Sequence, residues 1–147
     1  MLKTKLLQEN KEGKSMHYTI SNVTSDKGKT IPETKLIYID TVAYNVDDTK
    51  DEKPSSEDGP DWEDYWKKWT GRNLTDEKCA CCGCALTKEN RVGAHIRLIG
   101  ELDNTKDAWI ALFCKSCNNP SDKKARQVKS LSWIVRTVMS AAHKNVS

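Results

Sequence analysis

Six cysteines lie in the second half of the chain, and four of them form two close pairs. Cys114 and Cys117 make one C-x2-C pair, and Cys79 and Cys82 make another about 30 residues earlier. Thiolates on two such turns can surround a zinc ion tetrahedrally, which is the usual geometry of a structural zinc site. We therefore predict that these four cysteines bind Zn²⁺ in a structural role.

The upstream stretch CACCGC allows more than one choice of ligands. Cys81 and Cys84 make a second C-x2-C pair that overlaps the first, so Cys84 is an alternative to Cys82. We favour Cys82 because Gly83 follows it directly, and a small residue there lets backbone amides point at the sulfur. Cys81 is then a spare thiol.

A histidine and an asparagine accompany the cysteine pairs. His95 lies in the stretch VGAHI, and Asn118 directly follows the second pair. Three roles stay open for His95: the general base of a working nuclease, a residual histidine in a module that binds without cutting, or a structural histidine bonded to the backbone or to zinc. Asn118 has the same alternatives, since an asparagine at a helix start can also serve as a cap.

The elements around these residues follow from hydrophobic pattern and turn residues. Residues 91–99 and 108–113 predict two strands, with the turn GELDNTKD between them. Residues 60–71, PDWEDYWKKWTG, place four aromatic side chains at helical spacing, so we expect a helix with an aromatic core face that ends at Gly71. Apolar residues between 128 and 142 also recur at helical spacing, which predicts a C-terminal helix over about 122–143.

The first half of the chain predicts a separate appendage. Residues 17–24 and 35–46 are rich in β-branched and aromatic residues, so we expect a β-hairpin within residues 1–46. Residues 47–60 contain no apolar side chain and predict an acidic flexible linker. Residues 61–147 then form the zinc-bound domain, and the fold class predicted for the chain is α+β.

The first C-x2-C pair forms a tight turn, called a knuckle here, and two predicted strands separate it from the second pair. This arrangement resembles the HNH-type (ββα-metal, treble-clef) zinc-binding endonucleases over about residues 78–130. In that family a C-x2-C knuckle leads to a strand that ends in the catalytic histidine, and a second C-x2-C opens a helix. The matching positions here are Cys79 and Cys82, His95, and Cys114 and Cys117 followed by Asn118.

This resemblance implies a fold and a reaction. It implies a ββα zinc module with His95 as general base and Asn118 as a ligand of Mg²⁺ or another divalent cation that assists hydrolysis of a phosphodiester. Active members of the family usually have Asp or Glu directly before the histidine, and this chain has Ala94 there. The resemblance therefore predicts an HNH-like protein with a degenerate catalytic metal site.

Charge divides the chain unevenly and points to nucleic acid as a partner. Residues 78–147 carry 12 Lys or Arg against 5 Asp or Glu, whereas residues 1–77 carry 12 against 16. A basic, metal-bound half suits a phosphate backbone. The predicted phosphate contacts are Arg91, Arg97, Lys115, Lys123, Lys124, Arg126 and Lys129.

A second class of function is a protein-interaction factor, such as an inhibitor of a nuclease or of a defence enzyme. Such a factor would use the acidic residues 47–64 or the N-terminal hairpin to contact its protein partner. The first residues lack the apolar run of a secretory signal and no stretch suits a membrane span, so we expect a cytoplasmic protein with no membrane contact.

Overall fold

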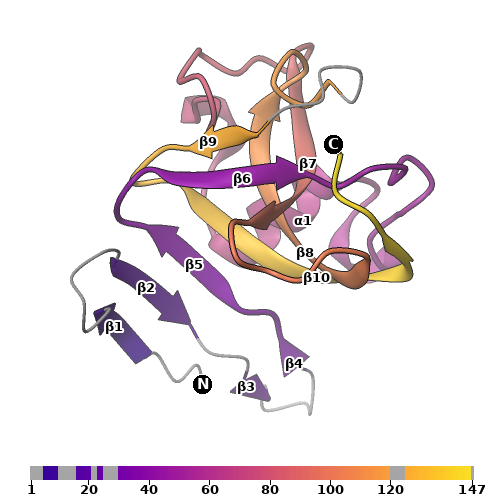
Figure 1. Cartoon of the computed structure of the whole chain (residues 1–147). Helices are drawn as coiled ribbons and strands as arrows, with labels where there is room; N and C mark the ends of the chain where they lie inside the picture. Colours follow the sequence, from indigo (N-terminus) through magenta and orange to yellow (C-terminus); the bar gives the residue numbers. More distant parts are fainter. Residues whose placement is uncertain (1–4, 10–15, 21–22, 25–29, 120–124, 147) are drawn as a thin grey trace.

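The computed structural model describes residues 5–9, 16–20, 23–24, 30–119 and 125–146. Most of the fold is one antiparallel sheet of eight strands in the order β1-β2-β5-β10-β8-β7-β6-β9, and β3 and β4 pair separately (Figure 1). The strands are β1 Lys5–Glu9, β2 Met16–Ile20, β3 Val23–Thr24, β4 Thr30–Ile31, β5 Thr34–Ile37, β6 Thr41–Asn45, β7 Arg91–Leu98, β8 Thr105–Cys114, β9 Arg126–Val128 and β10 Trp133–His143.

One short connection makes this sheet curl into a half-barrel. β5 and β6 lie four places apart in the sheet, yet only residues 38–40 join them. Four strand spacings in a flat sheet amount to about 19 Å, and three linking residues reach at most about 15 Å. The sheet must therefore curve until β6 comes close to β5, and Figure 1 shows β6 and β9 above β5 and β10.

The centre of the sheet is the core. In β8 every residue from Ala108 to Cys114 is buried, although successive side chains of a strand point to opposite faces. Both faces of β8 are therefore covered. On one face the Nζ atom of Lys35 and the Cζ atom of Arg136 lie 4.8 and 4.9 Å from the ring centre of Trp109. The predicted strands 91–99 and 108–113 are confirmed as β7 and β8.

The predicted aromatic helix is confirmed as α1, Trp62–Thr70. The side chain of Asp61 caps its start, and Gly71 ends it at a φ of 70°. Its aromatic face packs on β7, β8 and β10. The Tyr65 hydroxyl donates to the backbone oxygen of Arg136 at 2.7 Å, and the Trp66 indole donates to that of Trp133 at 2.8 Å. These polar atoms are thus satisfied inside the core.

Gly93 lies where the start of α1 meets β7. A Cβ added to Gly93 would lie 2.5 Å from the Cβ of Trp62 and 2.7 Å from its backbone carbon. Only a residue without a side chain lets the helix approach the strand this closely. The close contact explains a glycine in the middle of a strand that otherwise favours larger residues.

Gly93→Ala should therefore destabilise the protein without touching the cysteines. Because the clash involves helix backbone, the helix must shift, and we expect a loss of about 1–3 kcal/mol. Urea unfolding of the purified variant measures it. The matched control is Gly100→Ala, a position with open space around its Cβ but a φ of 91°, which strains the backbone without overpacking. Unfolding of Gly93→Ala at the wild-type urea concentration would show that the helix is not held at this distance.

The predicted C-terminal helix is wrong. Residues 122–124 of that prediction lie outside the described residues, and the rest contains β9 and β10, of which β10 pairs with β5 on one side and β8 on the other. The sequence from Trp133 to Met139 is rich in β-branched residues, which favour strands. Val138, which the helical pattern placed in the core, is 67% exposed, and the neighbouring Thr137 is buried instead.

The α+β treble-clef or ββα fold predicted for the cysteine region is therefore also wrong. A treble clef needs a helix at its second cysteine pair, and here a turn follows β8 and leads toward β9. The knuckle and the two strands of that prediction are present, but they belong to a curled, mainly antiparallel sheet, and within the described residues α1 is the one α-helix. A ββα treble clef is thus not the architecture of the described residues.

The first half of the chain is part of this sheet. β2 and β5 form the antiparallel pair predicted within residues 1–46, but β5 also pairs with β10, and β6 pairs with β7 and β9. A domain boundary after residue 46 would thus cut the half-barrel. Residues 47–60, expected to be a linker, include the buried Glu52 and the short turn Ser56–Asp58. In the described part of the chain, no helix has the length and apolarity needed to cross a membrane.

Candidate metal centre

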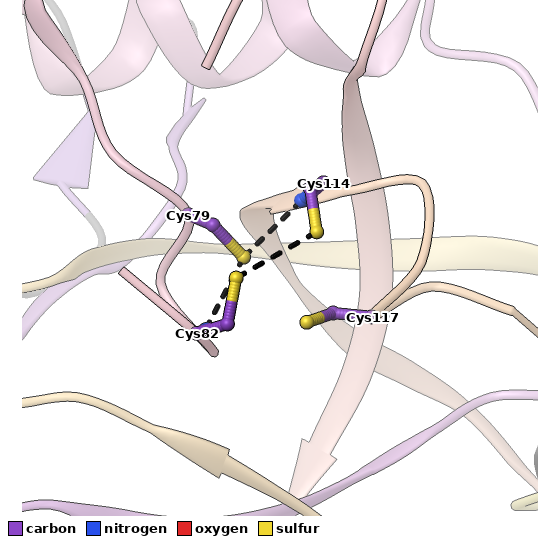
Figure 2. A group of neighbouring side chains, drawn as sticks. All are labelled: Cys79, Cys82, Cys114 and Cys117. Carbon is purple, nitrogen blue, oxygen red and sulfur yellow. Dashed lines mark hydrogen bonds between the residues drawn. The ribbon is translucent and has the colours of Figure 1, made fainter. Parts of the chain in front are cut away.

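The four predicted cysteines converge at one end of the β7–β8 hairpin. Figure 2 shows Cys79 and Cys82 from one turn facing Cys114 and Cys117 from the other. Their sulfur atoms all lie within 4.8 Å of one another, and those of Cys82 and Cys114 are 3.8 Å apart. A tetrahedron with Zn–S bonds of about 2.3 Å has sulfur atoms about 3.8 Å apart. This donor set could hold a metal ion such as zinc.

The first knuckle owes its shape to backbone hydrogen bonds. The amides of Cys81 and Cys82 each donate to the sulfur of Cys79 at 3.4 Å. The amide of Gly83 donates to the Cys79 carbonyl at 2.9 Å, and Gly83 has a φ of 80°. A residue with a side chain rarely adopts that conformation, so glycine is required here to aim the amides at the sulfur.

The second knuckle begins at the last residue of β8. The amide of Cys114 donates to the Cys79 sulfur at 3.2 Å, which ties the two knuckles together. The carbonyl of Cys117 accepts two side-chain hydrogen bonds, from Nδ2 of Asn45 at 3.0 Å and from Nε of Arg126 at 2.9 Å. Buried side chains from β6 and β9 therefore fix the position of the fourth cysteine.

The surroundings of the thiols suit thiolate ligands. The backbone amide of Cys84 lowers the pKa of Cys82 to about 6, even though burial acts in the opposite direction. Burial raises the pKa of Cys79, although three backbone amides donate to its sulfur. A bound dication would deprotonate both thiols, because the metal charge favours the thiolate strongly. Four thiols at tetrahedral spacing, with amides that solvate the charge, fit zinc.

The structure distinguishes between the overlapping ligand choices. Both Cys82 and Cys84 are exposed, but only Cys82 belongs to the group of four whose sulfur atoms all lie within 4.8 Å of one another. The carbonyl of Cys84 accepts from the amide of Cys79 at 2.8 Å, and its thiol lies within hydrogen-bond reach of the thiols of Cys82 and Cys114. Cys81 is partly buried against the core and also lies outside the group.

His95 is in the interior of the protein. It is 5% exposed, and its ring lies edge-on to that of Trp62, with 4.7 Å between the ring centres. Nε2 has no hydrogen-bond partner within the described residues. Burial lowers the pKa of His95 to about 4, so the ring is neutral at pH 7. A general base must reach its substrate, and this side chain is covered by the first turn of α1.

Glu52 is a buried carboxylate near His95, and no pattern in the sequence marks it as a site residue. Glu52 is 7% exposed and accepts hydrogen bonds from the Ser140 amide at 2.8 Å, from the Ser140 hydroxyl at 2.7 Å and from Nε2 of His143 at 2.9 Å. Trp62 donates its indole N–H to the Glu52 carbonyl at 2.9 Å. In the sequence Glu52 is one of several acids in residues 47–60, and such an acidic stretch predicts side chains exposed to solvent.

Asn118 lines a hollow together with Asp47 and Asp48 and is not a member of the cysteine group. Its amide donates to the Cys114 carbonyl at 3.2 Å. Among the described residues, the four cysteines are the one set of three or more His, Cys, Asp or Glu ligand atoms gathered within 4.8 Å. His95 belongs to no such group in the described structure, although Glu52 and His143 lie near enough to influence its charge.

The predicted phosphate contacts separate into buried and exposed groups. Arg97 is 1% exposed, and its guanidinium donates to the carbonyls of Thr105, Asp107 and His143. Arg126 is also buried, so neither side chain is on a surface that a phosphate could contact. Arg91 pairs with Glu63 at 3.1 Å. The remaining predicted contacts fall in two groups: Lys115 and Lys129 are exposed, and Lys123 and Lys124 lie outside the described residues.

Comparison with known proteins adds no relative. No protein-family model, no curated protein and no solved structure matches this chain. The function proposed for the chain therefore depends on the geometry of the metal centre and of the surface around it.

Proposed function

We propose that this chain is a zinc-stabilised nucleic-acid-binding protein, in which the cysteine centre has a structural role and the surface beside the first knuckle contacts phosphates. The observation that supports it best is a hollow of about 240 Å³ at that knuckle, with Arg72, Lys78 and Lys129 in its wall. Glu77 is the one acidic residue that lines it, and Arg72 already pairs with Glu77 at 3.1 Å. Lys78 and Lys129 thus present unbalanced positive charge.

The metal centre fixes the position of both lysines. Lys78 precedes the ligand Cys79 directly, and the amide of Lys129 donates to the carbonyl of Ala80 at 2.7 Å. The side chain of Lys129 runs over the knuckle, since a Cβ added to Gly83 would lie 3.3 Å from the Lys129 Cε. A structural zinc ion would therefore hold two cations at the mouth of one hollow, which is suitable for a phosphate backbone.

Binding without cleavage suits this geometry better than hydrolysis. The resemblance to an HNH nuclease assigned the base to His95, which is buried against Trp62 with a pKa of about 4. Ala94 leaves no carboxylate beside it in sequence. A role for residues 47–64 in binding a protein partner stays a prediction, and no contact in the described structure favours it over nucleic acid.

The test is a salt titration of binding to labelled DNA and RNA by fluorescence anisotropy. Affinity should fall steeply with salt, because each phosphate contact releases counterions and contributes roughly 0.7–0.9 to the slope of log K against log salt. The double variant Lys78→Gln with Lys129→Gln should bind more weakly and have a slope smaller by about 1–2. Binding that ignores salt, or no binding at about 50 mM salt, would refute the proposal.

A matched control removes the same kind of charge elsewhere. Lys106 is exposed near the start of β8, and the knuckle residue Cys114 ends that strand. Eight residues of strand separate them by about 26 Å. Lys106→Gln should leave the salt slope unchanged, and an equal loss in this variant would mean that overall charge, not the hollow, determines binding.

A further inference from the structure

A second hollow, of about 310 Å³, lies between the segment that follows β6 and the second knuckle. The side chains that line it carry oxygen donors for the most part: Asn45, Asp47, Asp48, Thr49 and Asn118. No thiol or imidazole is among its lining residues. An all-oxygen donor set suits hard cations and is a poor site for zinc.

The side chain of Asn45 is buried, and one of its polar atoms has no hydrogen-bond partner in the described structure. It is the last residue of β6 and is 4% exposed. Its Nδ2 donates to the Cys117 carbonyl, but its Oδ1 has no hydrogen-bond partner in the described structure. A buried amide oxygen without a partner costs about 1–3 kcal/mol. Such an atom in a native protein commonly marks the position of a bound ion or water.

The charge around Asn45 favours a cation. The carboxylates of Asp47 and Asp48 are exposed and lie within two and three residues of Asn45, and Lys50 is the one basic residue in the lining. Backbone hydrogen bonds hold this segment in place: the amide of Val46 donates to the His95 carbonyl at 2.9 Å and that of Asp47 to the Lys144 carbonyl at 2.7 Å. The donors therefore start from a fixed backbone, which lowers the entropy cost of binding.

We propose that this hollow binds a hard divalent cation of the calcium type, with the carboxylates of Asp47 and Asp48 and the amide oxygen of Asn45 as protein ligands. Ca²⁺ accepts mixed carboxylate and amide oxygens in flexible geometry, and two carboxylates place the site in the weak range, with a Kd of about 10⁻⁴–10⁻³ M. This site goes beyond nucleic-acid binding and does not depend on it.

The same amide would then link two metal sites. A cation on Oδ1 of Asn45 polarises the amide and strengthens the hydrogen bond from Nδ2 to the carbonyl of Cys117. By reciprocity, an ion in either site favours the other. Occupation of the hollow should thus strengthen binding of the metal by the cysteines.

The experiment is calorimetric titration of Ca²⁺ into the zinc-loaded full-length protein. We expect one saturable site, weakened at least about tenfold in Asp47→Asn and in Asp48→Asn, because each removes one of two anionic ligands. Asp51→Asn is the matched control: this residue is exposed in the same segment, does not line the hollow and loses the same charge. Its affinity should equal that of the wild type.

Two results would overturn this inference. Absence of saturable binding up to about ten times the upper expected Kd would mean that a water molecule, not a cation, satisfies Asn45. Equal weakening in Asp51→Asn would mean diffuse attraction to an acidic segment. Circular dichroism of each variant shows that it is folded, and zinc content shows that the cysteine centre is intact, so failure here is distinct from failure of the zinc or nucleic-acid proposals.

Discussion

Removal of metal from the cysteine centre should unfold the protein. Structural zinc contributes about 10–16 kcal/mol in small zinc peptides, whereas the net stability of a domain is about 5–15 kcal/mol. The chain has little else to replace it, since only 37% of its residues are hydrophobic and its mean hydropathy is -0.73. The expected result is loss of cooperative melting when a zinc-selective chelator is added.

Hydrogen bonds from the first knuckle to other segments explain why metal removal should unfold more than the cysteine turns. The Ala80 amide donates to the Leu112 carbonyl of β8 at 2.8 Å, and the Ala80 carbonyl accepts from Lys129, just after β9. Without metal, four thiols and these three segments lose their common anchor. Thermal melts followed by circular dichroism measure the change, and added Zn²⁺ should restore it. A calcium-selective chelator serves as control and should leave the melting temperature within a few degrees of the wild type.

The second large effect is expected at Glu52. Glu52→Ala would leave the Ser140 amide, the Ser140 hydroxyl and His143 without their shared acceptor. Loss of a buried acceptor that takes three hydrogen bonds costs about 1–3 kcal/mol. Urea unfolding at pH 7 measures it, and Asp51→Ala, which removes an exposed acid in the same segment, should change stability by less than about 0.5 kcal/mol.

The contribution of Glu52 should also depend on pH. Burial by itself would raise the pKa of Glu52, but the amide and hydroxyl of Ser140 together with His143 outweigh it and lower the pKa to about 2 from an ordinary value of 4.5. Because the folded pKa is the lower one, this stabilisation is complete above about pH 4.5 and is lost as the pH falls toward 2. The difference between wild type and Glu52→Ala should shrink over that window. A difference that stays constant from pH 7 to pH 2 would contradict the ionised state.

The metal centre and its nearest elements were predictable from sequence because their signals are local. Two C-x2-C pairs specify ligands directly, Gly83 marks the knuckle, and the aromatic spacing in 62–69 describes one face of a helix. These features depend on residues a few positions apart. Contacts with distant residues therefore did not change the structure that these local features predict.

The rest of the fold depends on contacts between distant residues. β10 was predicted as a helix because its apolar residues recur at helical spacing, but its pairing with β5 and β8 decides its conformation. Glu52 and Ser140 lie 88 residues apart, so nothing local marked Glu52 as an anchor. Arg97 was predicted as a surface contact, and its burial depends on carbonyls from β8 and β10.

The most direct test of the account is the zinc content of the purified protein and of two serine variants that differ in one position of the same knuckle. Wild type and Cys84→Ser should each contain one zinc ion per chain, and Cys82→Ser should lose most of it, because Cys82 lies in the group of four and Cys84 lies outside it. Zinc retained in Cys82→Ser, or none in the wild type, would contradict the central claim.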